Sequence, residues 1–393
     1  MICTRPKFKL GTISRLGWFY IIVSTITGSA VGLTTKGMNE VPKTKLCETC
    51  EPTAFYHPYM QTLVMFVAEF CCVFPYLYQR RNQKTKYVPL DQVNSSSKKP
   101  FKWYHSFLFA VPVVCDLIGT ILSNIGIYMC LVSVHSMIRT FNVVFVALFS
   151  LGFREFRRNF DLPQILGLVI LMIGLFLTVL VSILRPESTA EDPLVGSLVT
   201  IASTLFQALF YISEEIFIRK LDVAAAAGVA FEGLWGTIFM CILMPVFCSI
   251  DDPFGDGKME NFKGWVHQLK QSSGLIVLQV FYFLMVLVFN LTGLETTKNT
   301  SSSVRTTFGT MRPIIIWIIS FCCLWEVFDA IETPVKLIGF TIAIFGILTY
   351  NNILIIFPFA KEHNQETHQG KIKDSGIKLI ETNAAEGQVD AWA

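Results

Sequence analysis

The chain has 393 residues, of which 52% are hydrophobic and 16% are charged, and its mean hydropathy is +0.53. Soluble proteins carry roughly 25% charged residues, so this composition excludes an ordinary soluble domain and indicates a protein surrounded by membrane lipid. The net charge of +3 is too small to indicate a nucleic-acid partner.

Apolar segments of membrane-spanning length follow one another along the chain. A crossing helix needs about 20 mostly apolar residues. Ten segments meet this requirement, at residues 15–35, 58–79, 106–129, 133–153, 162–184, 194–217, 228–249, 274–294, 303–324 and 334–357. The first has no small-residue cleavage site, so we expect a spanning helix there and not a removed signal peptide. The sequence therefore predicts an all-α membrane protein with ten transmembrane helices.

Basic residues predict the orientation of these helices. If the N-tail (1–14) is cytosolic, the loops on the cytosolic side carry more Lys and Arg than the loops on the other side, and the densest cluster lies between Arg80 and Lys102. The positive-inside rule then places both termini in the cytosol. Residues 358–393 are polar and lack apolar periodicity, so we expect a flexible cytosolic tail.

The ten helices divide into two halves of five, at 15–184 and 194–357. An odd number of crossings gives the halves opposite orientations, which is the inverted repeat common in secondary transporters. Each half carries an acidic residue, a proline and two glycines seven residues apart around its fifth helix: Asp161, Pro163, Gly167 and Gly174, then Glu332, Pro334, Gly339 and Gly346. The paired glycines predict close packing of helices.

Arg139 and Arg312 lie inside apolar segments, at matching places in the two halves. A guanidinium stays charged at any ordinary pH, and an arginine at membrane depth should face protein or water. The two residues therefore indicate a solute pathway. Structural ion pairing, such as Asp116 with Arg139, is the alternative.

Other polar residues at membrane depth extend this pathway. On the third predicted helix, Asp116, Thr120 and Asn124 lie on one stripe. Glu69 and Asp116 are candidates for carrying a coupling proton. The full predicted pathway consists of Lys36, Glu69, Asp116, Thr120, Asn124, Arg139, Glu232, Asn290 and Arg312. Lys36, Glu214 and Glu215 could instead reach lipid headgroups, and the amides and Thr120 could be hydrogen-bond partners between helices.

The eleven cysteines lie mostly in apolar segments, but Cys47 and Cys50 lie in a polar loop. They predict either a lumenal disulfide or two free or palmitoylated thiols. No set of four zinc ligands, glycine-rich phosphate loop or nucleophile–base arrangement is evident, so we expect no metal, no cofactor and no enzyme.

Short motifs carry a resemblance to a known family. They are Thr27-Gly28-Ser29, His57-Pro58, Met65-Phe66, Glu69-Phe70, Cys115-Asp116, Gly119-Thr120, Arg139, Glu214-Glu215, Glu232-Gly233-Leu234, Thr297-Lys298, Arg312, Ile315-Ile316-Trp317 and Trp325-Glu326. In this order they resemble the drug/metabolite transporter superfamily, whose carriers consist of two EamA-type repeats. Within it, the chain is most similar to subfamily F of the nucleotide-sugar-transporter-like solute carrier family 35, and more distantly to the chloroquine-resistance-type transporters. The resemblance implies an alternating-access carrier and names no substrate.

The primary hypothesis is a secondary-active transporter of a small organic solute, with a proton as the candidate coupling ion. We expect a lysosomal, endosomal or vacuolar membrane before the Golgi or endoplasmic reticulum, and a homodimer is a candidate assembly. Helices three, four, eight and nine should line one cavity, with Arg139 and Arg312 toward its opposite ends. The alternatives are a nucleotide-sugar antiporter and a membrane scaffold that transports nothing.

Overall fold

The computed structural model describes residues 14–41, 43–46, 48, 51–84, 103–152, 162–184, 192–221, 223–251, 258–300, 302–323 and 331–350. The predicted C-tail, all but the last residue of the predicted N-tail, and Cys47 and Cys50 lie outside the described residues. The disulfide and the character of both tails therefore stay predictions.

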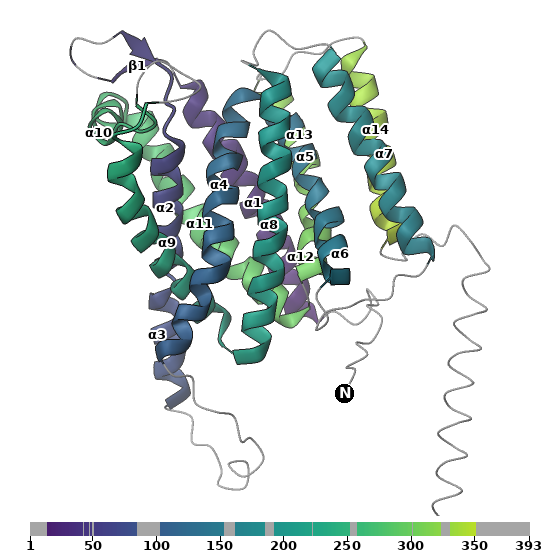
Figure 1. Cartoon of the computed structure of the whole chain (residues 1–393), viewed down its shortest axis with the longest axis horizontal. Coiled ribbons are helices and arrows are strands. Elements are labelled where there is room, and N and C mark those ends of the chain that lie inside the picture. Colours follow the sequence, from purple (N-terminus) through teal and green to yellow (C-terminus); the bar gives the residue numbers. More distant parts are fainter. Residues whose placement is uncertain are drawn as a thin grey trace, which may run out of the picture.

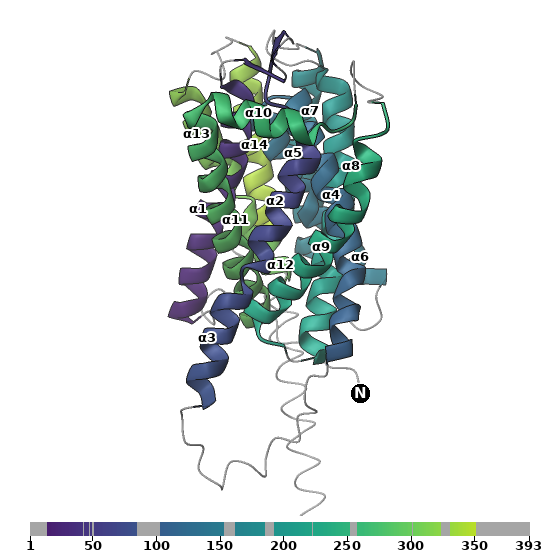
Figure 2. The same cartoon turned by 90° about the vertical axis from the view of Figure 1, so that its left-hand side faces the viewer.

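The described residues are mostly helical (Figure 1). The helices are α1 (Arg15–Glu40), α2 (Pro58–Phe70), α3 (Val73–Lys84), η3 (Trp103–Phe109), α4 (Ala110–Met129), α5 (Val132–Ile138), η4 (Arg139–Phe141), α6 (Asn142–Gly152), α7 (Leu162–Leu184), α8 (Pro193–Leu221), α9 (Ala225–Phe247), α10 (Phe262–Gln271), α11 (Ser273–Asn299), α12 (Ser302–Gly309), α13 (Arg312–Cys322) and α14 (Glu332–Tyr350). Two short strands, β1 (Thr44–Lys45) and β2 (Pro52–Thr53), pair antiparallel with Thr44 opposite Thr53. Most helices run alongside one another, while α10 lies across one end of the bundle (Figure 2).

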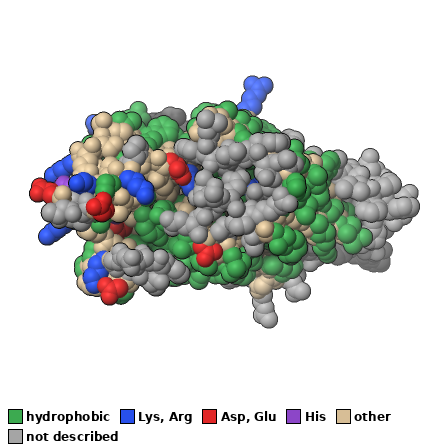
Figure 3. Space-filling model, turned by 90° about the horizontal axis from the view of Figure 1, so that it is seen from above, with side chains coloured by type: hydrophobic (Ala, Val, Ile, Leu, Met, Phe, Trp, Pro, Cys, Tyr) green, Lys and Arg blue, Asp and Glu red, His purple; other side chains and the backbone are tan. Residues whose placement is uncertain are grey.

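The outer surface of the bundle is apolar, as a lipid-facing protein requires. Within the described ranges, nine helical segments are long and apolar enough to cross a membrane. Large apolar side chains are exposed on their outer faces, for example Phe176 on α7 and Ile242 on α9. Seen from above, charged side chains gather over the side that carries α10 and the hairpin, and hydrophobic side chains are visible along the flanks of the bundle (Figure 3). The chain is therefore an integral, multi-pass membrane protein.

Three of the predicted helices are interrupted. The segment predicted at 58–79 turns at Cys71–Cys72 between α2 and α3, and the one at 303–324 turns at Thr310–Met311 between α12 and α13. A proline follows each turn, Pro75 and Pro313, and a proline cannot donate the helical hydrogen bond to the residue four positions earlier. The segment at 133–153 narrows to the 3₁₀ turn η4 at Arg139. Because α12 and α13 are both short, ten crossings stay a prediction.

Helices of the two halves pack against each other in pairs. The pairs are α1 with α11, α2 with α9, α4 with α8, α5 with α13, and α7 with α14. Exchanging the two halves converts each pair into another pair or into itself. This pattern favours the inverted repeat, whose exact ten-helix form stays a prediction.

The glycines predicted to allow close packing lie between α7 and α14. A Cβ atom added to Gly346 would lie 2.7 Å from the carbonyl oxygen of Gly167, and one added to Gly339 would lie 2.8 Å from that of Gly174. No side chain larger than hydrogen fits these positions without moving a backbone, so the prediction of close contact is confirmed.

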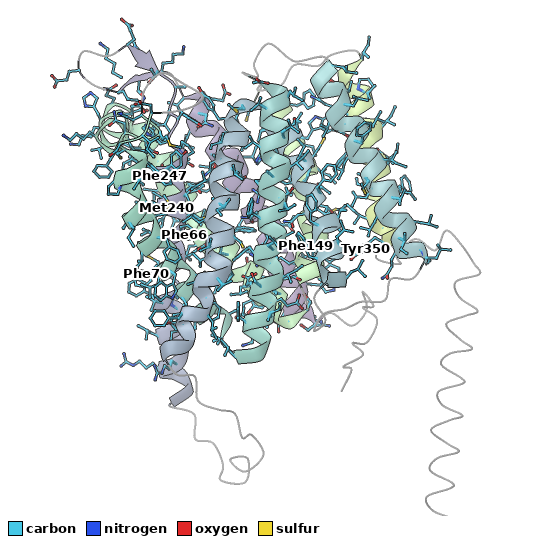
Figure 4. All side chains as sticks on the ribbon, in the orientation of Figure 1. Phe66, Phe70, Phe149, Met240, Phe247 and Tyr350 are labelled. Atoms are coloured by element: carbon cyan, nitrogen blue, oxygen red, sulfur yellow. The ribbon has the colours of Figure 1, made fainter. Side chains whose placement is uncertain are left out.

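The largest hydrophobic cluster lies on the opposite side of the bundle, between α2, α9 and α11. Phe66, Met240 and Phe247 follow the α2–α9 contact (Figure 4), and Phe66 and Met240 are fully buried. This apolar side and the α7–α14 pair leave the polar side chains of the helices between them to face inward.

Candidate functional site: a polar cavity at the centre of the bundle

A cavity of about 140 Å³ lies among the helices of both halves. Residues of α1, α2, α4, α5, η4, α6, α8, α11, α12 and α13 line it. The sequence predicted only the third, fourth, eighth and ninth crossing helices as its walls, which correspond to α4, α5–α6, α11 and α12–α13. The helices α1, α2 and α8 are therefore additions. Five charged side chains face it: Glu69, Asp116, Arg139, Arg305 and Arg312. Charges in an apolar bundle are concentrated where protein can surround them.

Asp116 is hydrogen-bonded by an amide and a hydroxyl. The Nε2 of Gln207 on α8 donates to Asp116 Oδ1 at 2.7 Å, and Thr120 Oγ1 donates to the same oxygen at 3.2 Å. The helical spacing of four places Thr120 directly over Asp116, as predicted. Within the described residues, Arg139 makes no direct ion pair with Asp116, and their structural pairing stays an alternative interpretation.

Arg139 lies on the 3₁₀ turn η4 and donates from Nη1 to Ser123 Oγ at 3.4 Å. The same hydroxyl lies 3.1 Å from Nε2 of His135. A short 3₁₀ stretch within a helix often marks a functional position. No carboxylate of the described residues pairs with this guanidinium, which leaves its charge facing the cavity.

Glu69 contacts α11 across the cavity. The Nδ2 of Asn290 donates to Glu69 Oε1 at 2.5 Å. The other carboxyl oxygen, Oε2, is buried and has no hydrogen-bond partner in the described structure. Asn290 and Glu69, both predicted pathway residues, are thus hydrogen-bonded to each other. The buried Glu69 Oε2 remains unpaired beside the cavity.

Arg305 forms a buried ion pair that the sequence did not predict. Its Nη1 donates to Glu214 Oε2 at 2.8 Å, and both side chains are almost completely buried. Its guanidinium carbon also lies 4.7 Å from the centre of the Tyr211 ring. The acidic pair at the end of the sixth predicted helix therefore does not reach headgroups. Glu214 pairs with Arg305, and Glu215 accepts the backbone N–H of Ser302 at the start of α12 at 3.1 Å.

Arg312 is the first residue of α13 and lies over an aromatic ring. Its guanidinium carbon is 4.5 Å from the centre of Phe289, and its Nε is buried without a hydrogen-bond partner. The backbone of α1 approaches closely, since a Cβ added at Gly28 would lie 2.7 Å from that Nε. Arg312 has no carboxylate partner among the described residues. The ring of Phe289 therefore stacks on its guanidinium, and Gly28, which has no side chain, leaves room for it.

Seven of the nine predicted pathway residues line the cavity, and Lys36 and Glu232 do not. Lys36 is buried and pairs with Glu40 at 3.0 Å, one turn along α1. Glu232 is buried on α9, where its Oε1 has no hydrogen-bond partner in the described structure. Asn124 has both of the expected roles, because it lines the cavity and donates to Thr62 Oγ1 of α2 at 3.1 Å.

Sequence reasoning missed Arg305, Gln207 and Phe289. Two signals were available. Arg305 precedes Arg312 by seven residues, and Gln207 precedes Glu214 by seven, so each pair shares one helical face. Phe289 gives no signal, because one phenylalanine among 34 in an apolar chain is indistinguishable from a packing residue. Among the described residues, no group of three or more His, Cys, Asp or Glu could hold a metal ion.

Comparison with known proteins matches nearly the whole chain. A family model described as solute carrier family 35 matches residues 19–352. The chain is 26% identical over 372 residues to solute carrier family 35 member F6 of Rattus norvegicus, covering 91% of this chain and 96% of that protein. It is 26% identical over 314 residues to the Homo sapiens protein of the same name, covering 78% and 81%. An uncharacterized protein of Schizosaccharomyces pombe is 27% identical over 308 residues, covering 77% of this chain and 89% of the yeast protein. The resemblance inferred from the motifs is confirmed.

Proposed function

The chain belongs to solute carrier family 35 and is therefore a membrane transporter of small solutes; from this premise we propose that its central cavity is the passage of an alternating-access carrier for a small organic solute. One observation carries the proposal. Two of the three interrupted segments, η4 with its flanking helices and α12–α13, occupy matching positions in the two halves, and each brings an arginine to the same cavity. In secondary transporters, interrupted helices at the interface of two repeats form the substrate site.

We further propose that Glu69 and Asp116 carry a coupling proton. Both carboxyl groups are buried at the cavity, and neither has an ion-pair partner in the described part of the chain. Their hydrogen-bond partners are neutral: Asn290 for Glu69, and Gln207 and Thr120 for Asp116. Amides and hydroxyls can hydrogen-bond either protonation state of a carboxyl group, since they offer both donors and acceptors. A group that can hold and release a proton without breaking an ion pair suits a coupling role.

Uptake into proteoliposomes tests both parts of the proposal. Vesicles containing the full chain would be incubated with a mixture of organic acids, amino acids, amines and nucleotide sugars, and their contents identified by mass spectrometry. We expect a small organic solute to accumulate with an imposed pH gradient. Glu69→Gln and Asp116→Asn should each reduce the gradient-driven accumulation by about 10-fold or more, as expected for loss of a residue in the proton path.

The matched control is Glu51→Gln, which removes an exposed carboxylate just before β2 and should leave uptake unchanged. If both cavity variants accumulated solute like the unmodified protein at every gradient, the proton coupling would be wrong. If a nucleotide sugar alone exchanged against a nucleoside monophosphate, the antiporter alternative would replace the small-solute carrier. If nothing accumulated, a role as a scaffold would be favoured.

The site of action is also a proposal. We propose a lysosomal, endosomal or vacuolar membrane with both termini in the cytosol, because an acidic lumen would supply the proton gradient. Fluorescence microscopy of a tagged chain tests the organelle. Asn299 is exposed at the end of α11, which this orientation places on the cytosolic side. Glycosylation of Asn299 would place it on the lumenal side and so contradict the orientation.

A further inference from the structure

The inference concerns the chemical class of the transported solute and rests on the proposed function. Two guanidiniums at the cavity, those of Arg139 and Arg312, have no carboxylate partner in the described structure, whereas Arg305 is neutralised by Glu214. The buried Nε of Arg312 has no hydrogen-bond partner. Burial of unpaired charge is strongly unfavourable, so a solute that supplies the missing negative charge would be bound preferentially.

The charge balance of the site shows when this preference is strongest. The ionisable groups that line or adjoin the cavity are Glu69, Asp116, His135, Arg139, Tyr211, Glu214, Glu232, Tyr282, Arg305 and Arg312. The three arginines stay charged. When Glu69 and Asp116 are protonated, the charges of Arg139 and Arg312 are not compensated at the cavity. When both carboxyl groups lose their protons, their negative charges compensate the two arginines. Proton binding and anion binding therefore favour each other at this site.

The rest of the wall fits an organic solute. Phe289 lines the cavity with its ring centre 4.5 Å from the guanidinium carbon of Arg312, and Met65, Ile127 and Val286 supply further apolar surface. The helix α13 begins at Arg312, so the positive end of its dipole adjoins the cavity as well. We propose that the cavity binds a small organic anion, a carboxylate or a phosphate monoester, with its charge neutralised by Arg139 and Arg312.

Thermal unfolding of the purified full chain with defined probes tests this class. The anionic probes are benzoate, succinate and phenyl phosphate, the cationic probes are choline and benzylamine, and glucose is neutral, all at one ionic strength. We expect a saturable rise of the unfolding temperature with a carboxylate, with phenyl phosphate or with both, which also distinguishes these two chemistries. The rise should be greater at pH 5.5 than at pH 8 and absent in Arg139→Gln and Arg312→Gln.

Arg80→Gln, on the exposed surface of α3, is the matched control and should keep the full rise. Arg312→Lys retains the charge and should keep part of it if Arg312→Gln does not fold. A rise with only the cationic or neutral probes, or with none, would overturn the anion class. Uptake of a cationic or neutral solute in the proteoliposome assay would meanwhile leave the carrier function standing.

Discussion

Arg305 shows how the surroundings of a residue decide what its charge does. Its partner Glu214 is buried with it, so neither charge can be screened by water. Removing one partner of a buried ion pair leaves an uncompensated charge and typically destabilises a protein by about 3–5 kcal/mol. Arg312 and Arg139 have no such partner in the described structure, which is why the proposed solute contact falls on them.

We therefore expect Arg305→Met to lower the unfolding temperature strongly. The double variant Arg305→Met with Glu214→Leu should recover much of the loss, because neither charge then remains buried. The control is Lys258→Met, which breaks the exposed pair with Asp251 and should change stability by about 1 kcal/mol or less. Thermal unfolding in detergent measures all three. A double variant no more stable than Arg305→Met would contradict the assignment of this pair.

At the residue scale, the sequence revealed the charges that lie in long apolar segments and concealed those in polar ones. Arg139, Arg312 and Asp116 could be predicted, because a charge surrounded by apolar residues must have a reason to be there. Arg305 lies among serines and threonines near the start of the predicted helix at 303–324 and resembles a residue at a helix end until α12 is seen to turn inward. Its partner could not be predicted, since pairing across helices depends on their rotation, which one sequence does not specify.

The interrupted segment α12–α13 is the element on which the site depends. Glu215 on α8 accepts the N–H of Ser302 at the start of α12, where backbone donors lack helical partners and negative charge is favourable. Glu215→Leu should therefore release the first turn of α12. A lost helix cap is worth about 1 kcal/mol, so amide exchange in α12 should increase about 5-fold. Glu295→Gln, whose carboxylate interacts with Asn299 of its own helix, is the control and should leave α12 unchanged. Unchanged exchange in Glu215→Leu would contradict this role.

The α7–α14 contact is the element that the sequence predicted most directly. Gly174→Leu and Gly346→Leu place side chains against backbone of the opposite helix, so we expect little folded protein from either. Gly152→Leu is the control, since no atom lies within 4 Å of the Cβ position there. The yield of monodisperse protein after detergent extraction measures the effect. Normal yield from both packing variants would show that the two helices do not meet as described.

The extent of each element was less predictable than its existence. Apolar length revealed where helices lie, and paired glycines revealed one contact between them. The turns at Cys71–Cys72 and Thr310–Met311 were not predicted, because a proline in a membrane helix can also be accommodated without a break. Which outcome occurs depends on the neighbouring helices that satisfy the freed backbone groups.

At the scale of the whole molecule, the paired helices of the two halves enclose one polar cavity in an otherwise apolar bundle. A carrier exposes such a cavity first to one side of the membrane and then to the other, whereas a scaffold has no need to. Alternating exposure is therefore the central claim, and it can be measured without knowing the solute.

The direct measurement is labelling of Ser136→Cys, at the cavity, by the membrane-impermeant reagent sulfonatoethyl methanethiosulfonate. The background would lack the eleven native cysteines, and proteoliposomes of known orientation would receive the reagent either outside or inside. Ser320→Cys, fully buried on α13 away from the cavity, is the control and should react from neither side. We predict that the cysteine at position 136 reacts from both sides; reaction from one side only, or from neither, would contradict an alternating-access carrier.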